Sequence, residues 1–171
     1  MLKILRYLFS FLRSVVLFES NKPLKINKKF KKNFKFIIFK FLKKNKNSEI
    51  LKYFDVYEFK KKRFKKKQFF IALLFKKKLL CSGWYFIGKE WYISEVDTTI
   101  RIKNSIMLFD FETPEGERNK GNYTTILKFI RNKFKLKKLL IYSLGSNHNS
   151  IKGITKAGFH FKKKISKFKK L

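Results

Sequence analysis

The middle of the chain shows the hydrophobic pattern of β-strands. Residues 68–75 and 79–87 are two runs of aromatic and aliphatic side chains, and only three lysines separate them. Such a short polar connection is typical of a β-hairpin. Five further runs are rich in aromatic or β-branched residues, so each is expected to form a strand. These runs are 49–59, 91–96, 106–113, 138–144 and 160–165.

The first 18 residues show a different spacing. Their apolar positions recur with the period of a helix, and Lys3, Arg6 and Arg13 belong to a narrow polar stripe between them. This pattern predicts an amphipathic helix over 1–18. The helix is expected either to pack on the domain or to lie on an anionic membrane surface. Its apolar runs are too short to span a bilayer, and the two arginines interrupt any signal-peptide core.

Three other polar or helical stretches complete the pattern. Residues 34–44 fit both the helix and the strand period, and we favour a helix. The lysine-rich residues 60–67 are expected to be a basic loop. Apolar positions at helical spacing predict a helix over 124–134. For the last helix, either Asn149 or Ser150 is the expected N-cap residue.

Two carboxylates occur within the run 106–113. If side chains alternate regularly, Phe109, Phe111 and Thr113 share one face of this strand, while Leu108, Asp110 and Glu112 share the other. Two neighbouring carboxylates can raise the pKa of one of them and so produce a general base. One of them can equally hold a structural hydrogen bond.

A glycine-containing turn follows this strand and precedes the helix at 124–134. The first backbone amides of a helix lack partners within it, and the helix dipole favours negative charge at that end. Gly121 allows a close backbone approach or a positive φ, and Arg118 and Lys120 add charged donors. Strand, turn and helix in this order predict an anion site for a phosphate group.

These residues resemble the GNAT superfamily of acyl-CoA N-acyltransferases. The resemblance rests on Arg118-x-x-Gly121 before a helix, and on a second motif from Asn147 to Phe159 that contains Ser150-Ile151, Lys156 and Gly158-Phe159. It extends from about Gly83 to Ile165. Tyr123 stands where the family's loop has a small residue, which is similar to a subset associated with surface-polysaccharide biosynthesis. The resemblance implies an α/β fold with a central mixed, mostly antiparallel sheet flanked by helices.

The resemblance also implies a coenzyme site with acetyl-CoA as the acyl donor and without a metal. Backbone groups at Phe111, Glu112 and Thr113 would bind the pantetheine arm. Asn147 and Ser150 would contact the coenzyme or the leaving thiolate. The pyrophosphate loop would comprise Arg118, Asn119, Lys120, Gly121, Asn122 and Tyr123.

The implied acceptor is a small amine, an amino sugar being one candidate. Asp110 and Glu95 are the expected proton acceptors, with Glu112 in reserve, and Glu95 is expected inside a strand. A carboxylate at these positions can also simply pair with a lysine. Ile154 stands where many family members have the tyrosine that protonates the thiolate. The usual general acid is therefore missing, and the fold without catalysis, as a binding module, stays an alternative.

Composition adds a competing interpretation. The chain has 171 residues, 44 basic and 11 acidic, and a formal net charge of +33. This charge predicts a nucleic-acid- or ribosome-associated protein, unless it reflects a biased composition that favours Lys, Asn, Ile and Phe. The single Cys81 and two histidines exclude a zinc cluster of the usual kind and suggest a reducing, cytoplasmic location. We expect a helical segment over 1–48 and the acyltransferase domain over 49–171.

Overall fold

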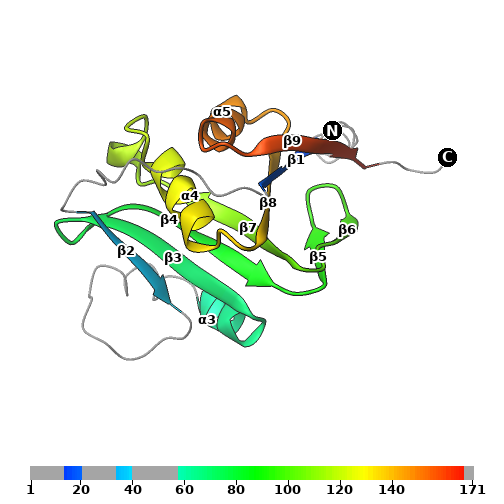
Figure 1. Ribbon diagram of the computed structural model, residues 1–171, viewed down its shortest axis with the longest axis horizontal. Coiled ribbons are helices and arrows are strands. Elements are labelled where there is room, and N and C mark those ends of the chain that lie inside the picture. Colours follow the sequence, from blue (N-terminus) through cyan, green and yellow to red (C-terminus); the bar gives the residue numbers. More distant parts are fainter. Residues whose placement is uncertain (1–13, 21–33, 40–57, 168–171) are drawn as a thin grey trace, which may run out of the picture.

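Seven strands form one sheet in the computed structural model, which describes residues 14–20, 34–39 and 58–167. The sheet order is β2-β3-β4-β7-β8-β1-β9 (Figure 1). Only the pairing of β7 with β8 is parallel, and the other pairings are antiparallel. The strands are β1 (Ser14–Ser20), β2 (Phe34–Phe39), β3 (Gln68–Phe75), β4 (Lys78–Ile87), β7 (Ser105–Glu112), β8 (Lys138–Leu144) and β9 (His160–Ser166).

Helices and a small hairpin cover the two faces of this sheet. Apolar side chains of α4 (Asn122–Lys133) and α5 (His148–Lys156) belong to one core cluster with residues of β3, β4, β7 and β8. On the other face, α3 (Glu58–Lys65) and the hairpin of β5 (Glu90–Ile93) and β6 (Thr98–Arg101) pack on two further clusters. The expected mixed, mostly antiparallel sheet flanked by helices is therefore confirmed.

The N-terminal expectation is wrong where the structure tests it. Residues 14–18 were expected to end an amphipathic helix, but they lie in β1, between β8 and β9. Val15 and Leu17 are fully buried on one side, whereas Phe18 belongs to the cluster on the other side. A strand with partners on both edges and apolar side chains on both faces favours β-branched and aromatic residues. Residues 1–13 lie outside the described part of the chain.

Two further expectations before residue 68 are also wrong. We favoured a helix over 34–44, but residues 34–39, the described part of this run, form strand β2. Every residue of β2 pairs with β3. The expected basic loop at 60–67 is mostly helix α3, and it closes with a turn at Lys66 and Lys67. Glu58 and Phe59, the end of the expected strand 49–59, also belong to α3, and the rest of that run lies outside the described residues.

From residue 68 onward the expected elements agree closely with the structure. The strands β3, β4, β7, β8 and β9 and the helix α4 match their expected ranges within about two residues. The connection between β3 and β4 is a tight turn in which both Lys76 and Lys77 have positive φ, 46° and 71°. Such values are typical of the turns that match the twist of a hairpin.

Candidate functional site

A cavity of about 820 Å³ opens where β7 and β8 separate. The two strands pair from Ser105 with Lys138 to Leu108 with Ile141, and both continue beyond this point without pairing to each other. The volume lies within the range of small-molecule sites. We call its boundary on the loop before α4 and on α5 the helix end, and its boundary on β7, β8 and the β5–β6 turn the sheet end.

A β-bulge in β7 shapes the sheet end. Trp84 of β4 lies opposite Phe109, and Ser82 lies opposite Glu112, so Asp110 and Phe111 together face the single residue between Ser82 and Trp84. Asp110 has a φ of 48°, in the left-handed region. An extra residue of this kind bends a strand and redirects its side chains.

The bulge overturns the expected alternation of β7. Phe109 packs in the cluster on the α3 face, whereas Phe111 packs against the cluster on the α4 face. The expectation that these two rings share a face is therefore wrong. The residue of β4 opposite the bulge is Gly83, where a Cβ would lie 2.4 Å from the Phe111 ring. Only a glycine leaves room for this ring.

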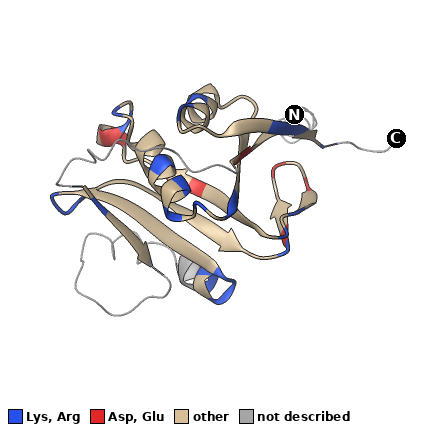
Figure 2. Cartoon of the chain, viewed as in Figure 1, with Lys and Arg blue, Asp and Glu red and all other residues tan. Residues whose placement is uncertain are grey.

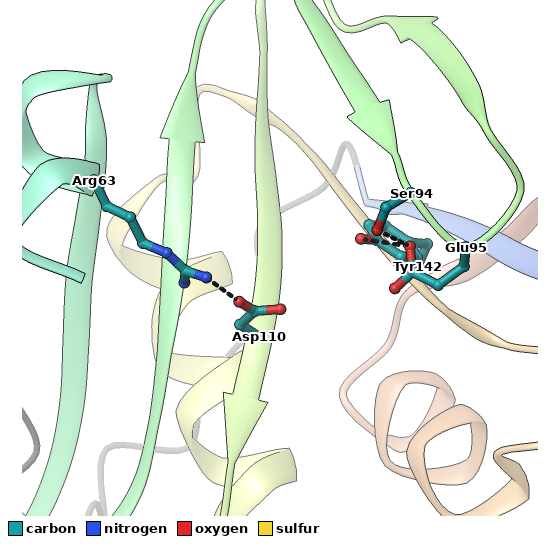
Figure 3. A network of polar contacts seen from close by, with 5 residues as sticks. All are labelled: Arg63, Ser94, Glu95, Asp110 and Tyr142. Atoms are coloured by element: carbon teal, nitrogen blue, oxygen red, sulfur yellow. Dashed lines mark hydrogen bonds and ion pairs between the residues drawn. The ribbon is translucent and has the colours of Figure 1, made fainter. Parts of the chain in front are cut away.

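Asp110 accepts a hydrogen bond from Arg63 of α3. Their Nη2 and Oδ2 atoms are 2.7 Å apart, and the Asp110 side chain is 54% exposed (Figure 3). The Arg63 guanidinium also lies over the rings of Trp84 and Phe109, 5.0 and 5.4 Å from their centroids. Cation–π contacts of this kind hold a guanidinium against an aromatic wall. Asp110 thus occupies the cavity as one half of an ion pair.

Glu95 lies in the turn between β5 and β6, and not inside a strand as expected. The turn begins after Ile93 and is stabilised by a hydrogen bond from the Tyr92 hydroxyl to Asp97, 2.7 Å long. The Glu95 Oε2 atom accepts hydrogen bonds from Ser94 Oγ at 3.2 Å and from Tyr142 Oη at 3.4 Å (Figure 3). Two donors therefore orient this carboxylate at the sheet end.

Tyr142 is a cavity residue that the sequence analysis did not identify. Burial and the Glu95 carboxylate raise the pKa of Tyr142. The phenol therefore stays protonated at neutral pH and acts as a donor. One signal was available: Tyr142 lies near the carboxyl end of a parallel strand, where ligands bind in α/β sheets.

The helix end is built around the glycine turn. Gly121 has a φ of 75° and precedes the first residue of α4, while open space surrounds the position of a Cβ there. The backbone conformation, and not a close contact, therefore requires glycine. The side chain of Asn122 donates to the Glu117 carbonyl at 3.0 Å, and Arg118 Nε donates to the Thr113 carbonyl at 3.3 Å. These bonds fix the loop between β7 and α4.

Glu117 and Lys120 form an ion pair in this loop. Glu117 is buried and pairs with Lys78 at 2.6 Å and with Lys120 at 3.3 Å. The hydrogen bond from Lys78, followed by the weaker one from Lys120, holds the pKa of Glu117 below its ordinary value. Lys120 does not line the cavity. Its expected contact with a pyrophosphate stays a prediction.

The α5 side of the helix end contains Asn147 and Ser150. Asn147 is the N-cap residue of α5, because its side chain accepts from the Ser150 amide at 3.0 Å, so the expected caps Asn149 and Ser150 are wrong. The Ser150 hydroxyl lies 3.4 Å from that of Tyr123. Burial raises the pKa of Tyr123 to about 12. Ile154 is fully buried in the core and does not line the cavity.

The cavity brings together residues from both expected sites. Every candidate residue except Lys120 lines it, although their roles in binding and catalysis stay predictions. The lining candidates are Glu95, Asp110, Phe111, Glu112, Thr113, Arg118, Asn119, Gly121, Asn122, Tyr123, Asn147 and Ser150. Tyr142 also lines the cavity, as do Lys152 and Lys156 of α5 at the helix end, and none of the three was an expected site residue.

Within residues 14–20, 34–39 and 58–167, no group of three or more His, Cys, Asp or Glu side chains is placed to hold a metal ion. In the same part of the chain, no helix has the length and apolar character needed to cross a bilayer.

Solved structures show a similar fold. A putative GNAT-family acetyltransferase from Novosphingobium aromaticivorans DSM 12444 matches with a TM-score of 0.58 at 11% identity, over 89% of this chain and 61% of that protein. A GCN5-related N-acetyltransferase from Sphaerobacter thermophilus matches with a TM-score of 0.57 at 7% identity, over 96% of this chain and 54% of that protein. A conserved protein of unknown function from Staphylococcus epidermidis ATCC 12228 matches with a TM-score of 0.57 at 8% identity, over 89% of this chain and 59% of that protein.

These likenesses identify the fold. The chain has the GNAT fold, and it spans less than two thirds of the length of each of these proteins. Neither the protein-family models nor the curated protein sequences match it. At identities of 7% to 11% these structures show the fold alone. A fold does not determine an activity, which depends on the residues of the site.

Proposed function

We propose that this protein transfers an acyl group, acetyl in the first instance, from acyl-CoA to an amine. The observation that carries the proposal is the cavity between the separated ends of β7 and β8. One end of this cavity is the start of a helix behind a glycine turn, and the other contains a carboxylate oriented by two hydroxyl groups. Several solved proteins of this fold are described as acetyltransferases, which supports the choice of acetyl-CoA.

The helix end has the chemistry to hold the coenzyme. The first amides of α4 and the guanidinium of Arg118 are donors for a pyrophosphate. Lys152 and Lys156 line the same end and add positive charge. The residues of β7 from Phe111 onward pair with β4 on one edge only, and the other edge borders the cavity. Their backbone groups are therefore suited to bind an extended pantetheine arm as a strand would.

The sheet end has the chemistry for proton removal. An alkyl ammonium must lose a proton before its nitrogen attacks the thioester carbonyl, because only the neutral amine has a lone pair. Glu95 accepts this proton, and Tyr142 and Ser94 hold its carboxylate in place. The new C–N bond forms as the C–S bond breaks, and the leaving coenzyme thiolate takes up, through water, the second proton that the nitrogen loses. The second candidate base is Asp110 of β7, which lies on the opposite side of the cavity from Glu95 and pairs with Arg63.

Two measurements test the proposal. Acetyl-CoA at millimolar concentration is expected to raise the melting temperature, since a ligand that binds the native state stabilises it by mass action. Release of the coenzyme thiol in the presence of an amine, followed with a thiol reagent, is expected to report turnover. An unchanged melting temperature would reject the donor site, and binding without thiol release for any amine would leave a binding module.

The nucleic-acid alternative predicts basic side chains gathered on one face. In the part of the chain that the structure describes, lysines and arginines lie on α3, on the turn between β3 and β4, on α4 and on β9 (Figure 2). These elements occupy different sides of the sheet. The distribution therefore does not favour a single phosphate-binding face.

A further inference from the structure

The charges that line the cavity are divided between its two ends. The basic lining residues Arg118, Lys152 and Lys156 all lie at the helix end. The acidic lining residues at the sheet end are Glu95 in the β5–β6 turn and Asp110 and Glu112 of β7. Glu117 lies at the helix end, but Lys78 and Lys120 compensate its charge. The cavity is thus positive where the coenzyme would bind and negative at the opposite end.

This concentration of carboxylates stands out against the composition. The chain contains 44 basic and only 11 acidic residues. Four of these acidic residues line one cavity, and three of them lie at its sheet end. Scattered surface carboxylates would need no explanation in this chain, because lysines surround them. Arg63 compensates the charge of Asp110, so Glu95 and Glu112, with no lysine among the lining residues of the sheet end, place negative potential where the acceptor would enter.

The basic side chain that pairs with Asp110 is also held by aromatic rings. Arg63 pairs with Asp110 at 2.7 Å and lies over Trp84 and Phe109, with its side chain 20% exposed. Figure 3 shows Arg63 approaching Asp110 from the side away from Glu95. An acceptor that carried a carboxylate or phosphate would have to take Arg63 from Asp110 and would meet Glu95 and Glu112 as like charges.

Aromatic side chains also line this end. Phe109 and Tyr142 line the cavity beside the carboxylates. Phe109 also contacts Trp91, with their ring centroids 4.4 Å apart. Apolar rings next to carboxylates suit a chain of methylene groups that carries positive charges along its length.

From this polarity we infer that the acceptor is an aliphatic diamine or polyamine, a molecule with at least two amino groups and no anionic group. The inference rests on the proposed function and names its substrate class. One amino group lies at Glu95, loses a proton and attacks the thioester. A second amino group stays protonated and pairs with Glu112 and Asp110. Glu112 is then a specificity-determining residue, which binds the part of the acceptor that does not react.

The first experiment separates this inference from the proposed function. The melting-temperature shift with acetyl-CoA alone reports the donor site and involves no acceptor. Thiol release is then compared for 1,4-diaminobutane, for butylamine of the same carbon length, for lysine and for glucosamine. The diamine is expected to have a kcat/KM at least about tenfold above that of butylamine, because one added charge pair is typically worth that factor in a partly enclosed site.

Variants test whether Glu112 causes the preference for the diamine over butylamine. Glu112→Gln, which changes an exposed side chain and no backbone group, is expected to raise KM for the diamine about tenfold and to change KM for butylamine much less. Glu90→Gln is the matched control, because Glu90 is an exposed carboxylate of β5 that does not line the cavity. It is expected to change neither constant. The diamine KM is also expected to rise more steeply with salt than the butylamine KM.

The outcomes distinguish the two ideas. If acetyl-CoA stabilises the protein and an amine is turned over, but butylamine, lysine or glucosamine equals or exceeds the diamine, the diamine inference is wrong and the proposed function stands. An unchanged diamine KM in Glu112→Gln also overturns it. If acetyl-CoA has no effect on stability and no amine releases thiol, both the proposed function and the inference fail.

Discussion

The ring of Tyr123 occupies the space that a side chain at Gly153 would need. A Cβ at Gly153 would lie 2.7 Å from a ring carbon of Tyr123. The same ring packs on Phe111, with centroids 5.5 Å apart, and its hydroxyl lies beside Ser150. Tyr123 thereby connects the first turn of α4 with β7 and α5. The missing side chain on α5 explains how a large residue fits where the resemblance led us to expect a small one.

The first prediction concerns this pair. Gly153→Ala is expected to destabilise the protein by about 1–3 kcal/mol, because the added methyl overpacks against the Tyr123 ring. In a Tyr123→Ala background the same change is expected to stabilise by about 0.5–1 kcal/mol, since alanine is the better helix former. Urea unfolding of the four proteins of this cycle measures both values. The same sign in both backgrounds would show that the ring is not the cause.

The second prediction concerns the glycine turn. Gly121→Val is expected to abolish the melting-temperature shift with acetyl-CoA, because a β-branched residue is strongly disfavoured at a φ of 75° and its side chain would block the helix start. Gly116→Val is the control, since that glycine has open space around its Cβ and no positive φ. A full shift in Gly121→Val would move the donor site elsewhere.

The third prediction concerns proton removal at the sheet end. Glu95→Gln is expected to keep the shift with acetyl-CoA and to lower turnover about a hundredfold to ten-thousandfold, the usual cost of losing a general base. Tyr142→Phe removes one donor to Glu95, and a smaller loss is expected, with a changed pH profile of kcat. Asp110→Asn tests the second candidate base by the same two measurements. If both carboxylate variants keep near-normal turnover from pH 6 to 9, proton loss directly to water becomes the better account.

The fourth prediction concerns acid stability. Glu19 of β1 pairs with Lys138 at 2.7 Å and with Lys162, and the hydrogen bonds from these lysines hold the pKa of Glu19 below its ordinary value. A carboxylate with a lowered pKa stabilises the folded state above its unfolded pKa of about 4.3, and this stabilisation is lost as the pH falls toward the folded pKa.

Glu19→Gln tests this linkage. The variant is expected to lower the melting temperature at pH 7 by about 2–4 °C, corresponding to about 1 kcal/mol in a domain of this size. The difference from the wild type is expected to shrink below about pH 4. Thermal unfolding of both proteins at pH 7 and pH 3.5 measures it, with Glu90→Gln as control. A difference that persists in acid would assign the effect to packing.

The sequence predicted the C-terminal two thirds of the fold and most of the cavity lining, because the signals there are local. The turn at Gly121 and the run from Asn147 to Phe159 each lie within one short segment, and the strands around them are bounded by clear turns. Local period and turn chemistry are enough to place such elements.

Relationships between distant residues explain what the sequence did not predict. Arg63 and Asp110, and Glu95 and Tyr142, are each 47 residues apart, and no spacing rule connects them. The bulge at Asp110 is determined by pairing with β4, which interrupts an alternation that looked regular. The run that became β2 fitted either period, and the run that became β1 continued the helical spacing of residues 1–18, so in both the tertiary partners determined the outcome.

The position of β1 within the sheet has a consequence for how the molecule acquires its structure. β1 leaves the ribosome before both of its neighbours, β8 and β9, which lie more than a hundred residues later in the chain. The strand that carries the buried Val15 and Leu17 therefore has no strand partner until β8 and β9 have been synthesised. Such high contact order slows folding and leaves an unpaired, aggregation-prone segment exposed in the meantime. Production of this protein should therefore depend on chaperones, and slower synthesis at lower temperature should raise its soluble yield.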